Sequence, residues 1–129
     1  MLESSSVTAP KIVSDVVKFD LQDYSRETAT IASGNGIISI GEVLGLVTAS
    51  GKHAKFDNAA VDGTQVAVAV SRAKVDSTAG DITGVPVEVR VCTVILGELV
   101  FDAGQDQAAQ DGAIVDLVAA GFKVTTELG

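Results

Sequence analysis

The chain has 129 residues, the length of a single domain, and a formal net charge of -8 from 17 acidic and 9 basic residues. So acidic a surface disfavours a phosphate backbone, and we expect no nucleic-acid partner. No apolar stretch is long enough to span a membrane, and the first residues lack the basic and apolar blocks of a signal peptide, which predicts cytoplasmic synthesis without a membrane partner.

Residues 1–33 differ in composition from the rest of the chain, because they contain no Gly and open with the polar group Ser4–Ser6. Their apolar side chains include Ile12, Val13, Val16, Val17, Phe19 and Leu21. The spacing of the first four fits a helix, and the alternation from Val17 to Leu21 fits a strand. Two interpretations stay open: the segment packs on its own domain's core, or it is an extended arm that pairs with another chain.

From residue 34 onward, short apolar runs alternate with turn residues. Val43–Val47 and Lys52–Phe56 flank a turn in which Gly51 can adopt a positive φ, so we predict a hairpin. Asp62–Gly63 marks the next turn, and the alternation over Val66–Val70 predicts another strand.

The longest predicted strand covers Val85–Leu96, where apolar residues alternate almost without interruption. Leu99–Phe101 is predicted as a short neighbouring strand. One helix follows, with Asp106 or Asp111 as its N-cap. Its expected apolar stripe is Ile114, Leu117 and Val118. Gly121 suits a left-handed C-terminal cap, and Phe122–Leu128 is the last predicted strand. Many short strands and one helix indicate a mainly β domain of barrel-like or clip-like form.

The residue types that catalysis usually needs are scarce. His53 is the only histidine, lies between Lys52 and Lys55, and is predicted to be a surface or subunit-contact residue. Cys92 is the only cysteine and is predicted to be a buried, inert thiol. One His and one Cys do not supply the ligands of a zinc cluster.

Other candidate motifs also fail on spacing. Ser50–Lys52 lacks the second glycine and the following helix of a phosphate loop. The acidic residues of the last third do not have the spacing of a calcium loop. Asp57 and Asp62 are predicted as turn residues. We therefore expect no enzyme activity, no cofactor and no metal.

Several segments between Gly41 and Leu128 resemble the bacteriophage head decoration protein family in their order and spacing. They are Val43–Val47, Ala49–Lys52, Asp57–Thr64, Val87–Val91, Gly97–Leu99 and Leu117–Val124. The resemblance implies a β-clip-like fold and a homotrimer. It also implies binding at threefold points on the outside of an expanded icosahedral head, where trimers hold the major capsid protein of a tailed phage against the pressure of packaged DNA. The expected location is the virion.

On this basis the chain divides into an N-terminal arm, residues 1–33, and a β-rich decoration domain, residues 34–129. The arm is predicted to bind the capsid through its apolar side chains Ile12, Val13, Val16, Val17, Phe19 and Leu21. Two alternatives remain: another trimeric β-clip-like structural protein, or a nucleotide hydrolase of trimeric β architecture. The hydrolase needs phosphate-binding groups near Gly-rich turns, and Arg26, Arg72 and Arg90 lie apart from such turns.

Overall fold

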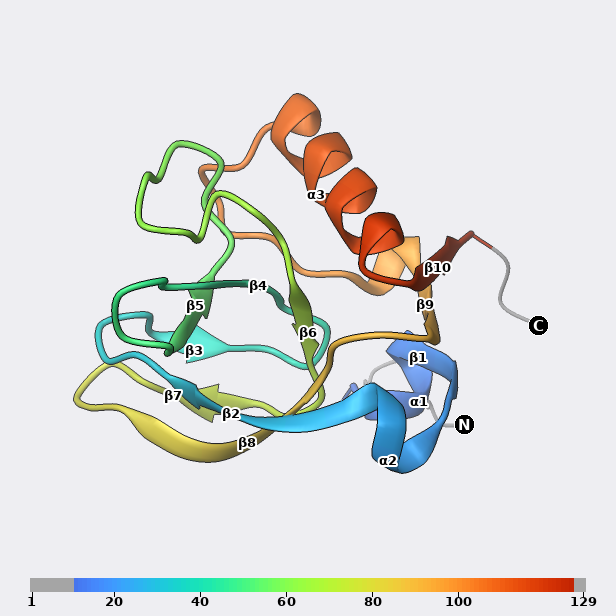
Figure 1. The fold of residues 1–129 in the computed structure, drawn as a ribbon, viewed down its shortest axis with the longest axis horizontal. Coiled ribbons are helices and arrows are strands. Elements are labelled where there is room, and N and C mark those ends of the chain that lie inside the picture. The colour runs from blue at the N-terminus through green and yellow to red at the C-terminus, as the bar shows by residue number, and fades with distance from the viewer. Residues whose placement is uncertain (1–10, 127–129) are drawn as a thin grey trace, which may run out of the picture.

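A closed barrel of five strands forms the body of the protein in the computed structural model, which describes residues 11–126 (Figure 1). In pairing order the barrel strands are β2 (Arg26–Ile31), β5 (His53–Lys55), β4 (Val43–Leu46), β6 (Ala69–Ser71) and β8 (Ile82–Glu88). β8 pairs back with β2 and so closes the ring. Neighbouring strands are antiparallel, except that β2 and β5 pair in parallel through Ile31 and His53.

A second sheet has three strands, with β9 (Cys92–Ile95) in the centre. β1 (Val17–Asp20) runs antiparallel to β9, and β10 (Phe122–Thr125) runs parallel to it. β3 (Ile37–Ile38) and β7 (Val75–Asp76) form a further two-stranded sheet. The predicted fold class, mainly β and barrel-like with one short helix near the C-terminus, is confirmed.

The N-terminal segment uses both sequence patterns in succession. The helical spacing becomes the single turn α1 (Val13–Val16), and the alternation becomes β1. A second single turn, α2 (Gln22–Ser25), then leads into β2 of the barrel. Residues 13–31 therefore pack with strands of the later chain, which is the first of the two arrangements that the sequence left open. Residues 1–10 of the predicted arm lie outside the described residues.

The predicted hairpin is confirmed, because β4 and β5 pair antiparallel with Leu46 opposite His53. Gly51 in its turn has φ 74. Gly45, in β4, lies against the chain after the next turn: a Cβ added there would be 2.5 Å from the Cα of Thr64. Only a glycine allows this close approach of two backbones.

The single long strand predicted over Val85–Leu96 is wrong. The chain turns between β8 and β9 at Val91, which has φ 48. The end of α2 holds this corner: the backbone N–H of Val89 donates to the carbonyl of Ser25, and the Ser25 hydroxyl donates to the carbonyl of Val91. Alternation of apolar residues continues through the corner, so the sequence pattern does not reveal it.

Two other predicted strands are shorter than expected. The strand predicted over Val66–Val70 is confined to β6 at Ala69–Ser71. Leu99–Phe101 contributes only an isolated bridge between Val100 and Glu42, after the 3-10 turn η2 (Leu96–Glu98).

The predicted helix is α3 (Gln107–Ala119), and its N-cap is Asp106, whose carboxylate accepts a hydrogen bond from the backbone N–H of Ala109. Its buried face consists of Ala109, Ala113 and Leu117, whereas Val118, predicted in the apolar stripe, is 54% exposed. Gly121 ends the helix at φ 105, as expected. No helix within residues 11–126 is long and apolar enough to cross a membrane.

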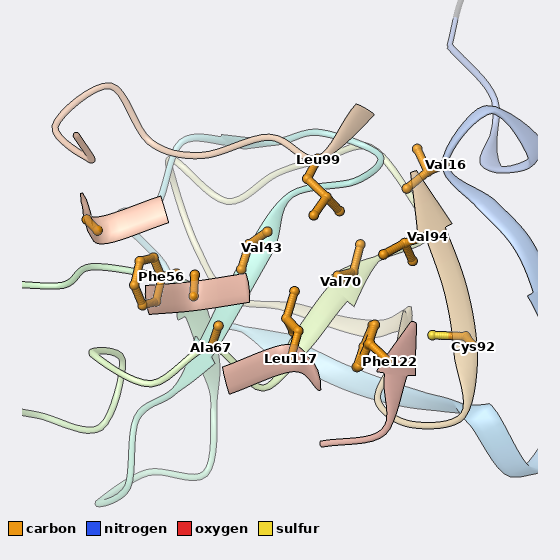
Figure 2. Close-up of a cluster of buried hydrophobic side chains, with 12 residues drawn as sticks. Val16, Val43, Phe56, Ala67, Val70, Cys92, Val94, Leu99, Leu117 and Phe122 are labelled. Atoms are coloured by element: carbon orange, nitrogen blue, oxygen red, sulfur yellow. The ribbon is translucent and has the colours of Figure 1, made fainter. Parts of the chain in front are cut away.

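Two hydrophobic clusters form the core, one on each side of the barrel wall. Successive residues of a strand point to opposite faces, and so Leu44 lies in one cluster and Val43 in the other. The first cluster fills the barrel with side chains such as Ile31, Val85 and Val87. The second, shown in Figure 2, joins α3 and the three-stranded sheet to the outer face of the barrel; its members are Val16, Val43, Phe56, Ala67, Val70, Cys92, Val94, Leu99, Ala109, Ala113, Leu117 and Phe122.

Candidate interaction surface

The six apolar residues predicted to bind the capsid divide into exposed and buried members. Ile12, Phe19 and Leu21 are 56%, 52% and 46% exposed, whereas Val13 is half-buried. Val16 is fully buried in the second core cluster, and Val17 packs partly against it. A buried Val16 holds the N-terminal segment to the body and has no surface to offer a partner in this conformation.

β1 is an edge strand of its sheet, because its one strand partner within residues 11–126 is β9. The exposed ring of Phe19 lies on this edge strand. Tyr24, in α2, is also exposed, and the guanidinium of Arg90 lies 5.2 Å from the centre of its ring. The N-terminal segment thus presents several apolar side chains beside an edge strand, a combination used in strand-pairing recognition.

Beneath this segment lies a cluster of four charged residues, Asp20, Arg26, Arg72 and Glu88, called here the charge cluster. Strand register assembles it, since Arg26 on β2 is directly opposite Glu88 on β8, and Arg72 follows β6, which pairs with β8 on its other side. Asp20, at the end of β1, accepts hydrogen bonds from Nε and Nη2 of Arg26 at 2.6 and 3.3 Å. Glu88 is fully buried.

The carboxylate of Glu88 is held by charge more than by hydrogen bonds. Its Oε2 atom lies 2.8 Å from Nε of Arg72 and 3.8 Å from Nε of Arg26. The Arg72 contact lacks hydrogen-bond alignment, and neither carboxylate oxygen has a hydrogen-bond partner. Burial, with a contribution from neighbouring Asp20, raises the pKa of Glu88 to about 7, against the opposing effect of the two arginines. The hydrogen bond from Arg26 lowers the pKa of Asp20.

A cavity of about 500 Å³ opens between β1 and the charge cluster, and we call it the β1 cavity. Its lining combines apolar and basic side chains: Val13, Ser14, Val17, Lys18, Phe19, Asp20, Arg26 and Arg72. Arg26 and Arg72 also line a second cavity, of about 400 Å³. These arginines lie apart in the sequence, and the register that brings them together is not visible in local spacing. The one available signal is Glu88, an acid within a run of apolar residues.

Three further candidate residues from the sequence, Asp62, Cys92 and His53, lie outside this cluster. Asp62 is a turn residue, as predicted, and accepts hydrogen bonds from the backbone N–H and the hydroxyl of Thr64, which lower its pKa. Cys92 is buried, as predicted, and burial raises its pKa to about 12. His53 is half-buried on β5; desolvation lowers its pKa, and its Nδ1 atom has no hydrogen-bond partner.

The described residues, 11–126, contain no group of three or more His, Cys, Asp or Glu side chains that could hold a metal ion. The arrangement suits the binding of a partner, because exposed apolar side chains on an edge strand lie next to a cavity whose lining includes three basic side chains.

Comparison with known protein families identifies a match. A family model described as bacteriophage lambda head decoration protein D matches residues 6–122. No curated protein matches the chain. The matched range includes the N-terminal segment as well as the barrel, the second sheet up to Phe122 and α3.

Proposed function

This chain belongs to the bacteriophage lambda head decoration protein D family, and we propose that it binds as a homotrimer to the outside of an expanded icosahedral phage head. There it holds neighbouring subunits of the major capsid protein against the internal pressure of packaged DNA. The observation that carries the proposal is the family match over residues 6–122, which covers nearly all of the fold.

We propose that the N-terminal segment, within the arm of residues 1–33, is the main capsid-binding element. Its exposed apolar side chains Ile12, Phe19 and Leu21 support this, because their burial at an interface would stabilise the complex by roughly 1–3 kcal/mol each. This burial must offset the entropic cost of ordering chain on the capsid, which is roughly 1–2 kcal/mol per ordered residue. Three segments on one trimer would then give tight attachment from modest single contacts.

The test has two stages. Sedimentation equilibrium of the purified chain gives the mass of the assembly, and a trimer is expected. The trimer is then mixed with undecorated expanded heads of its own phage, and bound protein is measured after pelleting. A chain that stays monomeric, or a trimer that remains in the supernatant, contradicts the proposal.

Phe19→Ser tests the surface at residue level. Phe19 is half-exposed, so the substitution should leave the fold intact while weakening head binding about tenfold or more. Val61→Ser is the matched control, because Val61 is a 94% exposed apolar residue in the loop between β5 and β6. Equal binding by the two variants would remove Phe19 from the interface.

A further inference from the structure

Arg72 is a mostly buried cation with unused hydrogen-bond donors. Its side chain is 17% exposed, and its Nε atom is fully buried beside Glu88. Within residues 11–126, Nη1 and Nη2 of Arg72 donate no hydrogen bond to any group. A guanidinium buried to this degree normally has its donors satisfied, because an unpaired buried donor is costly. The outer edge of Arg72 is therefore prepared for an acceptor that enters from outside.

The charges around the β1 cavity leave a positive excess. Lys18, Arg26 and Arg72 contribute three positive charges to its lining, whereas the adjoining acids, Asp20 and Glu88, contribute at most two negative ones. Lys18 has no acidic partner within the described residues, since its ammonium group donates to the backbone carbonyl of Ser14. This local excess stands out on a chain whose net charge is -8.

The shape of the donor group indicates which anion fits. Nη1 and Nη2 of an arginine form a planar fork that matches the two oxygens of a carboxylate. The apolar walls, Val13, Val17 and Phe19, suit the methylene groups that carry a carboxylate in an acidic side chain.

We infer that the β1 cavity binds an acidic side chain of the major capsid protein, with Arg72 gripping the carboxylate through its two outer nitrogens and Lys18 as the second cation. The inference rests on the proposed function and adds the chemistry of the partner. The capsid is chosen as the source because Phe19 both lines the cavity and belongs to the exposed surface proposed to meet the capsid.

The direct test needs no capsid. The protein labelled with ¹⁵N is titrated with sodium glutarate, and the Nε–H signal of Arg72 is followed by NMR at constant ionic strength. We expect a saturable shift with a midpoint on the order of millimolar, as suits one bidentate ion pair. Sodium chloride at the same ionic strength should give no saturable shift. A linear response to glutarate, or the same response to chloride, overturns the inference.

Variants separate binding from a merely structural role of Arg72. Arg72→Gln paired with Glu88→Gln removes both charges of the buried pair, so the fold is kept while the response of the Lys18 signal to glutarate should disappear. Glu88→Gln alone leaves Arg72 in place and should bind glutarate at least as tightly as the unmodified protein. If Arg72 served only to neutralise Glu88, both variants would respond alike. Lys74→Gln is the control for the loss of a positive charge outside the cavity, because Lys74 is exposed nearby and does not line the cavity.

Head binding then identifies the source of the carboxylate. The double variant should bind expanded heads about tenfold or more weakly than Lys74→Gln, while its trimer mass is unchanged. Dissociation of the trimer would show that a second copy supplies the acid, and tighter glutarate binding by Glu3→Gln would show that the chain's own terminus does; either result contradicts the capsid as occupant. If the unmodified trimer ignores heads, the proposed function fails while the glutarate result still stands.

Discussion

Glu88 is a fully buried acid, and the burial of its charge destabilises the folded state. It sits between β2 and β6 in the barrel wall, fully buried, with two arginines and Asp20 around it. A buried acid whose pKa is raised binds a proton more tightly in the folded than in the unfolded chain. The folded state is therefore favoured at pH values where Glu88 is protonated.

This linkage predicts a pH-dependent stability that Glu88→Gln removes. The pKa of Glu88 rises from 4.5 to about 7 on folding, so the stabilisation is complete below pH 4.5 and is lost as the pH rises through 7. The full change is on the order of 3 kcal/mol. Urea unfolding of both proteins between pH 4.5 and 8 measures it. Parallel curves for the two proteins would show that Glu88 does not titrate in this range.

Cys92 is predicted to be unreactive while the protein is folded. Its pKa of about 12 leaves roughly one thiol in ten thousand ionised at pH 8, and the side chain is buried in the core. Labelling with a disulfide reagent should be negligible in buffer and fast in urea. Fast labelling in buffer would mean that β9 opens locally.

At the residue scale, the sequence was informative wherever the surroundings are local. The turn role of Asp62 and the burial of Cys92 follow from neighbouring residues, and both are confirmed. The charge cluster was missed because Arg26, Arg72 and Glu88 meet only through the register of three strands. Local spacing carries no information about that register.

At the scale of single elements, Gly45 ties the β4–β5 hairpin to the segment around Thr64. Gly45→Ala should lower the free energy of unfolding by about 2 kcal/mol or more, because its Cβ would be 2.5 Å from a backbone atom. Gly80→Ala is the control: nothing lies within 4 Å of a Cβ at Gly80, and the change should stay within about 0.5 kcal/mol. Thermal or urea unfolding distinguishes the two, and equal effects would contradict the close packing.

The start of α3 allows a similar comparison. Asp106→Ala removes the carboxylate that accepts from the Ala109 N–H and should cost about 1 kcal/mol. Asp111→Ala removes an equal charge from an exposed position in the helix, where the carboxylate accepts only from the Gln107 side chain. We expect less than about 0.5 kcal/mol there. A larger loss of stability for Asp111→Ala than for Asp106→Ala would contradict the assignment of Asp106 as the N-cap.

Elements bounded by recognisable turn or cap residues are predicted well from the sequence, and elements without such residues are not. The hairpin has Gly51 and the helix has Asp106 and Gly121, so their positions are confirmed. The corner at Val91 has no glycine, since a β-branched residue takes the positive φ there. Two hydrogen bonds with Ser25 fix the corner, and Ser25 lies 66 residues before Val91 in the sequence. These bonds form only when the chain has folded.

At the scale of the whole molecule, the N-terminal quarter of the chain supplies the barrel strand β2. β2 pairs with both β5 and β8, so a chain without residues 1–33 would have an open barrel with two unpaired strand edges. We expect this truncation to show no cooperative unfolding transition by circular dichroism. Removal of residues 1–10 alone leaves every described strand in place and should preserve the transition. A cooperative transition in the longer truncation would show that β2 is dispensable.

The arrangement of the second sheet determines which strand pairings carry a force applied to the two ends of the chain. Val17, where β1 begins, is opposite Val94, and Thr125, where β10 ends, is opposite the adjacent Ile95. Both tails therefore leave from one end of the same central strand. Tension that draws the tails apart acts perpendicular to the strands. It would therefore break the hydrogen bonds to β9 one after another, starting from that end. A capsid that gripped both tails would load the pairing of β1 and β10 with β9, whereas one that gripped only the N-terminal tail would leave β10 unstrained.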